Sequence, residues 1–282
     1  MAEKTVPAPH NSGKHRLDRA QFTWFMQDQE LAENTINTYL DSVTHFFGRF
    51  SELSKGNVLA YKRMMMEEAA PATVNLRLRA IAKYAEFAGL PECAVKGVKV
   101  QQRLDVENVI TEDEFKLLSD SLRQSNQKHY WIVQFLGKTG VRVSELIRLK
   151  KDCLTIGHQD LFSKGKIRRI YIPSTLAQES TEFFSEQGGG PLLFYNHSRE
   201  PFTRHGIKRL LTFHGDKYGI RREAMHPHSF RHFFAKQFLR ATADDIALLQ
   251  DFLGHSNINT TKLYLRTSAA EKRARLDASV DW

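Results

Sequence analysis

The sequence has few cysteines, no long apolar run and no apolar segment at its start. Its two cysteines, Cys93 and Cys153, lie far apart in 282 residues, so they predict neither a disulfide framework nor a four-thiolate zinc site. This scarcity fits a reducing, cytoplasmic location. No stretch approaches the roughly 18 apolar residues of a membrane-spanning helix, and the first ten residues lack the apolar core of a secretory signal. We therefore expect a soluble protein that is neither exported nor in a membrane.

Acidic residues are fewer than basic residues. Lys and Arg total 41 against 32 Asp and Glu, which gives a formal net charge of +9. Such an excess favours a polyanionic partner, either nucleic acid or an anionic membrane surface. A basic soluble protein without such a partner fits the charge equally well, because net charge reports on association and not on fold. The choice between these alternatives therefore rests on motifs.

Composition and periodicity divide the chain into four parts. Residues 1–14 are rich in Pro, Ser and Gly and are expected to form a disordered tail. Residues 15–92 carry four apolar stripes with spacings of three and four, typical of a compact helical domain. Residues 93–108 lose this period and carry basic charge, as a linker would. The run TEDE at 111–114 has the pattern of a helix cap and opens the second domain, residues 109–282.

The second domain is predicted to be mostly helical with one small sheet. Short strand candidates at residues 153–156, 159–162 and 168–172 are separated by Gly157 and Gly165. Helical patterns occupy much of the rest, at about residues 111–122, 127–138, 142–150, 174–187, 203–218, 228–241, 243–253, 257–266 and 269–279. The predicted fold class is mainly α with a small antiparallel β-sheet.

Arg142 stands at a predicted helix start, where its guanidinium and the exposed backbone N–H groups can hold an anion together. Glu145 follows three residues later on the same helix face and could orient it. An ordinary surface Arg–Glu pair is the alternative, and from these two residues alone it is the better interpretation.

His228 and Arg231 are three positions apart, so both project from one helix face. An imidazole beside a guanidinium is suited to phosphate oxygens. A polar surface face is one alternative. A metal site formed with His226 and His232 is another, but Zn²⁺ usually draws on a carboxylate or thiolate as well, and the nearest acid is Glu223.

Three further segments contain residues that indicate a function only when they are considered together with the arginines and His228. Lys164 and Lys166 flank the glycine of a predicted strand–turn–strand junction, where a lysine is usually a solvated turn residue. His255 follows Gly254, which is suited to end a helix, and could point into a cleft or cap that helix. Tyr264 lies in an amphipathic segment, where a tyrosine is most often part of the core.

Taken in order, these segments closely resemble the tyrosine recombinase, or phage-type integrase, family. The likeness rests on four motifs, which are TGVRVSEL at 139–146, HPHSFRH at 226–232, LGHS at 253–256 and TTKLY at 260–264. It covers residues of about 110–268. The helical N-terminal half is similar to the family's core-binding domain, a weaker match. The resemblance implies a two-domain DNA clamp.

The resemblance also implies a role for each motif residue. Tyr264 would be the nucleophile that attacks a DNA phosphate. Arg142 and Arg231 would clamp that phosphate, His228 would assist proton transfer, and His255 would hydrogen-bond a phosphate oxygen. These roles are chemically consistent, because a phenol of pKa near 10 needs an adjacent base or cations to attack as phenolate.

Lys164 resembles the β-hairpin lysine of the family, and Glu145 matches a supporting acidic position. Ser163 departs from the pattern, since Gly-Lys-Gly is more usual there than Ser-Lys-Gly. The choice between Lys164 and Lys166 as the catalytic lysine therefore stays open, with Lys166 otherwise a DNA contact.

The function implied is site-specific recombination, in which DNA is cleaved and rejoined through a 3′-phosphotyrosyl intermediate and a Holliday junction. The resemblance implies integration, excision or resolution of a DNA element, by a homo-tetramer on two double-stranded DNA duplexes with specific core sites. No cofactor and no metal are expected. Lys96, Lys99 and Arg103 of the basic linker would contact phosphates. The last helix, about 269–282, would pack on a neighbouring subunit or cap its own domain.

Two other functions compete with this one. A type IB topoisomerase uses a similar tyrosine and similar cations, but relaxes DNA as a monomer. A DNA-binding protein that has lost catalysis would keep the basic surface and lose some of the six predicted catalytic residues, all of which are present here.

Overall fold

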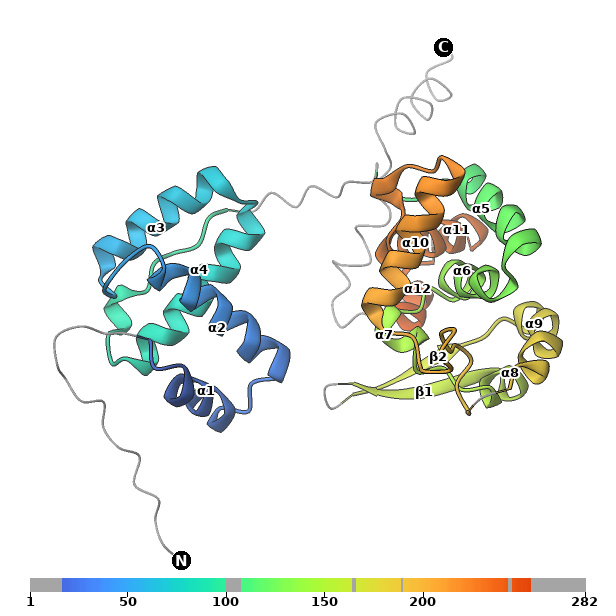
Figure 1. Ribbon diagram of the computed structural model, residues 1–282, viewed down its shortest axis with the longest axis horizontal. Coiled ribbons are helices and arrows are strands. Elements are labelled where there is room, and N and C mark those ends of the chain that lie inside the picture. Colours follow the sequence, from blue (N-terminus) through green and yellow to red (C-terminus); the bar gives the residue numbers. More distant parts are fainter. Residues whose placement is uncertain (1–16, 100–107, 164–165, 189, 243–244, 255–282) are drawn as a thin grey trace, which may run out of the picture. The chain divides into compact units, whose positions relative to one another are not determined.

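The computed structural model describes residues 17–99, 108–163, 166–188, 190–242 and 245–254 (Figure 1). The chain divides into two compact units, Met1–Arg103 and Leu104–Trp282. The described residues are mostly helical and include one two-stranded antiparallel sheet, so the predicted fold class is confirmed. None of the helices in these ranges has the length and apolar character needed to cross a membrane.

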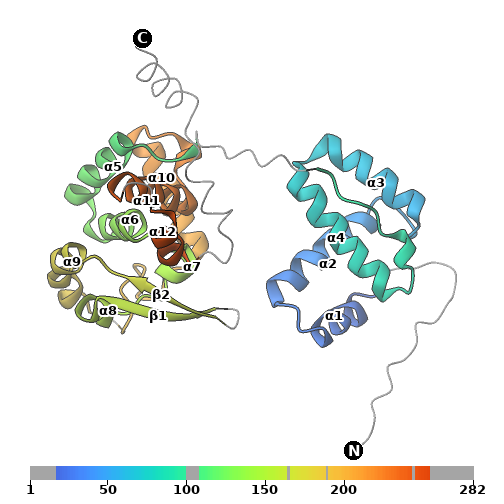
Figure 2. The same cartoon turned by 180° about the vertical axis from the view of Figure 1, so that it is seen from behind.

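The first unit is a small helical bundle. Its helices are α1 (Arg19–Asp28), α2 (Glu33–Phe47), α3 (Lys55–Glu68) and α4 (Pro71–Phe87), followed by the 3-10 turn η1 (Pro91–Cys93). Helix α4 contacts each of the other three helices (Figure 2). It begins at Pro71, whose fixed φ and missing N–H suit a first helical position.

The core of this unit is rich in aromatic rings. Phe22 meets Tyr84 edge-on, with 5.0 Å between ring centroids, a favourable arrangement for aromatic quadrupoles. Phe46 and Tyr61 pack in the same way at 5.3 Å. All four rings are buried, as the apolar stripes of the sequence predict.

The chain after η1 is held against the first unit. The backbone N–H of Val98 donates to Oδ1 of Asn75 over 2.7 Å, and Nδ2 of Asn75 donates to the carbonyl of Val98 over 2.9 Å. Lys62 Nζ donates to the carbonyl of Lys96. The predicted linker, 93–108, thus begins with residues that are bound to α3 and α4. The predicted domain limits otherwise stay a prediction.

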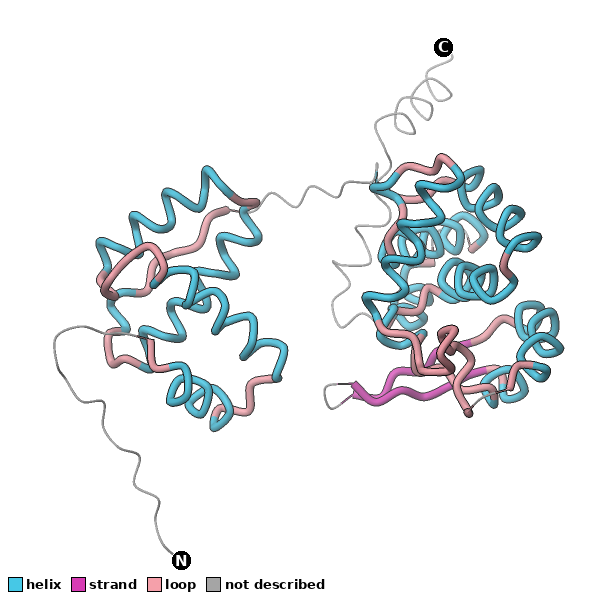
Figure 3. Tube along the Cα trace, viewed as in Figure 1, coloured by secondary structure: helices cyan, strands magenta, loops and turns pink. Residues whose placement is uncertain are grey.

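The second unit is built around α6. Its elements are α5 (Glu112–Ser125), α6 (Gln127–Thr139), α7 (Val143–Leu146), α8 (Asp152–Ile156), β1 (His158–Ser163), β2 (Lys166–Tyr171), α9 (Ser174–Glu186), α10 (Arg204–Tyr218), the 3-10 turn η3 (Arg222–Ala224), α11 (Pro227–Ala241) and α12 (Ile246–Leu253). Helix α6 contacts α5, α7, α9 and α11 (Figure 3).

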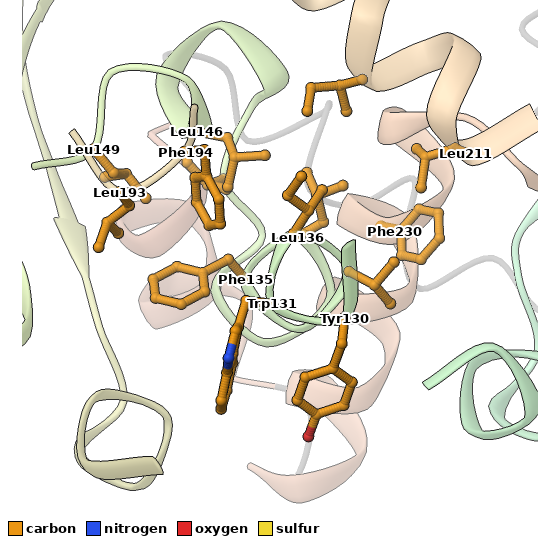
Figure 4. Close-up of a cluster of buried hydrophobic side chains, with 14 of the residues drawn as sticks. Tyr130, Trp131, Phe135, Leu136, Leu146, Leu149, Leu193, Phe194, Leu211 and Phe230 are labelled. Carbon is orange, nitrogen blue, oxygen red and sulfur yellow. The ribbon is translucent and has the colours of Figure 1, made fainter. Parts of the chain in front are cut away.

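Helix α6 is buried along almost its whole length, as an all-round apolar helix should be. Trp131, Phe135 and Leu136 extend from it into one hydrophobic cluster (Figure 4). On one side this cluster holds Phe194, and on the other it holds Phe230 of α11. The core therefore fixes α11 relative to the end of α6.

The helix cap predicted at residues 111–114 is confirmed. Thr111 Oγ1 accepts from the backbone N–H of Glu114 over 3.2 Å, and Glu114 accepts in return from the N–H of Thr111 over 2.9 Å. The two bonds form a capping box and satisfy N–H groups that an uncapped helix would leave open. Glu114 also pairs with Arg221, over 2.7 Å, which ties α5 to the chain before η3.

The two strands pair with His158 opposite Tyr171 and Ser163 opposite Lys166. The predicted strand at 153–156 is wrong, because these residues form the helical turn α8. Cys153 is buried there, and its carbonyl accepts from the N–H of Gly157 over 2.9 Å. Gly157 takes a φ of 81°, which ends the turn. The apolar residues of this segment suggested a strand, but the burial of Cys153 in the core favours the helical turn.

The helix predicted at 142–150 is also shorter than expected. It ends at Leu146, and Leu149 then accepts a backbone bond from Leu193. Gln159 of β1 accepts from the N–H of Lys150 over 2.7 Å and donates to the carbonyl of Arg148 over 3.0 Å. These contacts with the sheet region replace the helical bonds.

Candidate active site

Arg142 is the N-cap residue of α7 and follows a tight turn. Gly140 ends α6 with a φ of 60°, and a Cβ there would lie 2.4 Å from the ring of Phe234. Only glycine fits both demands. The Arg142 side chain is 41% exposed, so its guanidinium is held at the surface, where an anion can reach it.

Glu145 orients Arg142, as predicted. Its carboxylate accepts from Nη1 of Arg142 over 3.0 Å and from the backbone N–H of Arg142 over 2.8 Å. The carboxylate is buried. Burial by itself would raise the pKa of Glu145, but the charges of Arg168 and Arg142 outweigh it and hold the pKa below its usual value. Glu145 therefore stays ionised, and the alternative of a loose surface pair does not describe it.

Arg231 lies on α11 and is 2% exposed. Its Nη1 donates to the carbonyl of Gly140 over 2.7 Å, and its Nη2 donates to the carbonyl of Leu253 over 2.6 Å. A buried guanidinium is costly unless its N–H groups find acceptors. These two carbonyls supply them, so the side chain has a fixed orientation.

Three arginines meet the end of α12 at consecutive residues. The carbonyl of Phe252 accepts from Arg168 over 2.9 Å, that of Leu253 from Arg231, and that of Gly254 from Arg142 over 3.3 Å. The last carbonyls of a helix lack partners within the helix, and cations are favoured at that end. Arg142 and Arg231 are thereby brought to the carbonyls of two consecutive residues.

His228 lies in the first turn of α11, and its side chain is open to solvent. Its ring meets that of His232 edge-on, at 4.3 Å between centroids. Desolvation by the surrounding protein lowers the pKa of His228, and the charges of Arg231, His226 and Arg142 lower it further. The ring is therefore neutral near pH 7, with one nitrogen able to donate and the other able to accept.

The predicted alternative of a histidine metal site gains no support from His226. That residue is the N-cap of α11, and its Nδ1 accepts from the N–H of Ser229 over 3.2 Å. In the part of the chain that the structure describes, no three His, Cys, Asp or Glu side chains are grouped to hold a metal ion.

Arg168 is a site residue that the sequence did not predict. This residue of β2 has a side chain that is 10% exposed, and it bonds both Glu145 and the carbonyl of Phe252. Side chains of a strand alternate between faces, so the sequence allows either Arg168 or Arg169 to face inward. Arg168 shares a face with the buried Ile170, so it occupies an inward position and must find polar partners there.

Several predicted site residues lie outside the described residues, namely Lys164, His255, Tyr264 and Arg103. Lys166 begins β2, opposite Ser163. Lys96 and Lys99 are exposed on the segment that follows η1. The structure therefore links Arg142, Glu145 and Arg231 and adds Arg168 to them. His228 lies within range of the charges of Arg231 and Arg142.

Comparisons with known proteins point in one direction. The phage integrase family matches residues 108–271, more than half of the chain. "Tyrosine recombinase XerA" of Pyrococcus furiosus is 28% identical over 264 residues, which cover 88% of this chain and 89% of that protein. "Tyrosine recombinase XerD" of Staphylococcus haemolyticus is 27% identical and covers 97% and 91%.

Solved structures share the fold. A lambda integrase dimer bound to a COC′ core site superposes with a TM-score of 0.74 at 15% identity, covering 89% of this chain and 94% of that one. A crystal structure of XerA recombinase gives 0.54 at 23% identity, covering 94% and 98%.

Proposed function

This chain belongs to the phage integrase family, and we propose that it is a site-specific DNA recombinase of the tyrosine type. It cleaves and rejoins DNA through a 3′-phosphotyrosyl intermediate and a Holliday junction. The observation that carries this function is the convergence of Arg142 and Arg231 on the carbonyls of Gly254 and Leu253. Two guanidiniums held at the carbonyls of consecutive residues are suited to bind one phosphate together.

The arginines stabilise the transition state. A phosphodiester gains negative charge on its nonbridging oxygens when a nucleophile attacks, and preorganised cations stabilise that charge. One such donor is typically worth on the order of 10²–10³ in rate. Arg231 cannot swing away, because its guanidinium is buried and bonded to two carbonyls. Arg142 is more exposed, and its ion pair with Glu145 holds it in place.

The remaining roles follow the motifs. The Tyr264 oxygen attacks phosphorus, and the bond from phosphorus to the 5′ oxygen breaks. Lys164 or Lys166 donates a proton to the leaving oxygen. His228 assists proton transfer at the tyrosine, and His255 donates to a phosphate oxygen. A free 5′ hydroxyl later reverses these steps on the partner strand. Because the phosphotyrosine keeps the energy of the phosphodiester, ATP is not consumed.

The DNA contacts and the assembly are part of the same proposal. The first unit is a core-binding domain, and the exposed Lys96 and Lys99, with Arg103, contact backbone phosphates. Such contacts position a protein and carry little sequence information. The active form is a tetramer on two duplexes with specific core sites, and it works in the cytoplasm. The structural likeness to a lambda integrase dimer that is bound to a COC′ core site supports this partner.

Covalent capture of DNA tests the function and identifies the target site in the same experiment. Sheared genomic DNA of the source organism is incubated with the protein, and fragments that stay bound under denaturing conditions are sequenced. We expect the fragments to share one core sequence flanked by inverted repeats. Two copies of that core on one plasmid should then recombine.

Two outcomes would overturn the proposal. Covalent fragments without a shared sequence, together with relaxation of supercoiled plasmid, would identify a type IB topoisomerase. Sequence-selective binding without any covalent adduct would identify a DNA-binding protein that has lost catalysis.

A further inference from the structure

Arg168 stands between the β-hairpin and the catalytic arginines. It lies on β2, four residues after Lys164, and its side chain is nearly buried. One of its terminal nitrogens bonds Glu145, and the other donates to the carbonyl of Phe252 over 2.9 Å. One guanidinium therefore joins β2, α7 and the end of α12.

Glu145 is shared between two arginines. Its Oε1 accepts from Nη1 of Arg142, while Arg168 bonds its Oε2. An arginine and a carboxylate prefer two parallel bonds when nothing else competes. Arg168 supplies that competition and leaves Nη2 of Arg142 directed at the carbonyl of Gly254. Oε2 also accepts from the backbone N–H of Arg142. Without Arg168, the second lone pair of Oε2 becomes available to the side chain of Arg142, whose guanidinium would turn toward Glu145.

The end of α12 is shaped around the same side chain. A Cβ on Gly254 would lie 2.5 Å from Cδ of Arg168 and 2.6 Å from its Nε. Such a separation is well below van der Waals contact, so the chain passes Arg168 there only because residue 254 is glycine. The backbone of Gly254 thus rests against Arg168.

We propose that Arg168 is a positioning residue that sets the orientation of Arg142, through Glu145, and the path of the chain at Gly254, the end of α12. This inference rests on the proposed function, since it concerns the geometry of DNA cleavage.

The test compares three variants of the full-length chain. Arg168→Gln removes the charge and one of the two bonds, and Arg168→Lys keeps the charge but not the two-pronged geometry. Arg169→Gln is the matched control, because Arg169 is the next residue of β2, is exposed and forms an ion pair with Asp160. The probe is a nicked synthetic duplex that carries the captured core site. The measurements are the single-turnover rate of covalent adduct formation and the dissociation constant for the intact duplex.

We expect Arg168→Gln to slow adduct formation about 100-fold, the loss that a misplacement of about 1 Å can cause, with DNA affinity within about threefold of wild type. Arg168→Lys should recover part of the rate, and Arg169→Gln should match wild type. A pH profile adds a readout that a merely structural role would not move. Arg168 and Arg142 are the charges that lower the pKa of Glu145, so the acidic limb of the profile should shift to higher pH in Arg168→Gln and stay in place in Arg168→Lys.

Rates for both Arg168 variants equal to wild type would overturn the inference, as would an equal loss in Arg169→Gln. If Arg168→Gln does not fold, the test rests on Arg168→Lys. Its rate of adduct formation must then be below that of Arg169→Gln, while its melting temperature equals that of wild type. Absence of any adduct with the wild-type protein would instead count against the proposed function.

Discussion

The carbonyl oxygen of Leu253 accepts a hydrogen bond of 2.6 Å from Nη2 of Arg231. The same guanidinium reaches the carbonyl of Gly140, so a single side chain of α11 satisfies the ends of both α6 and α12. The bond therefore has two consequences. It holds the guanidinium of Arg231 in place, and it fixes the backbone at Leu253.

Replacement of Arg231 by lysine should damage both stability and activity. A lysine presents one compact charge and cannot span two carbonyls as the planar guanidinium does. One buried carbonyl then loses its partner, and we expect a loss of about 1–3 kcal/mol in the free energy of unfolding. Adduct formation should fall by about 100-fold or more. Urea unfolding and single-turnover cleavage measure the two effects, and an unchanged unfolding curve would contradict the buried role.

Substitution of Gly254 by alanine should cost more than the same change at Gly219. Both residues end a helix with positive φ, 60° and 68°, so both variants carry the cost of a left-handed Cβ, about 1–2 kcal/mol. A Cβ on Gly219 meets nothing within 4 Å, whereas one on Gly254 meets Arg168. Thermal unfolding should therefore show the larger loss for Gly254→Ala, and only this variant should cleave DNA slowly. Equal losses and equal rates would show that the contact with Arg168 is unimportant.

A buried histidine pair predicts how stability depends on pH. Nδ1 of His129 lies 2.8 Å from Nε2 of His214. Burial and the neighbouring His214 lower the pKa of His129 from 6.5 to about 4. The unfolded chain therefore binds a proton near pH 6.5 that the folded chain takes up only near pH 4.

The contribution of His129 is thus complete above pH 6.5 and is lost as pH falls from 6.5 toward 4, by about 2–3 kcal/mol in total. Denaturant unfolding at a series of pH values should show this slope, and His129→Gln should reduce it. A slope that is the same in wild type and variant would contradict the assignment.

Local patterns were sufficient for much of the fold and for part of the site. The capping box at Thr111 and the His228–Arg231 helix face depend on residues three positions apart, and such relationships are present in any single turn of helix. The apolar stripe of α4 is buried for the same reason. These features follow from local spacing along the chain.

The features that could not be predicted depend on contacts between residues that are far apart in the sequence. Residues 153–156 have the composition of a strand, yet burial of Cys153 and the turn at Gly157 make them a helix. Arg168 matters because it meets Glu145, 23 positions earlier, and Phe252, 84 positions later. Only the packed fold shows which face of the hairpin turns inward, and so which of the neighbouring arginines, 168 or 169, is held.

Identification of the amino acid that becomes linked to DNA tests the account most directly. Adducts formed on the captured core site are digested with protease and nuclease, and the modified peptide is sequenced by mass spectrometry. We predict a nucleotide joined through its 3′ phosphate to Tyr264, and no adduct with Tyr264→Phe, whose DNA affinity should stay within about twofold of wild type because a single hydroxyl is removed. A nucleotide on any other residue, or adducts that persist in Tyr264→Phe, would contradict the account.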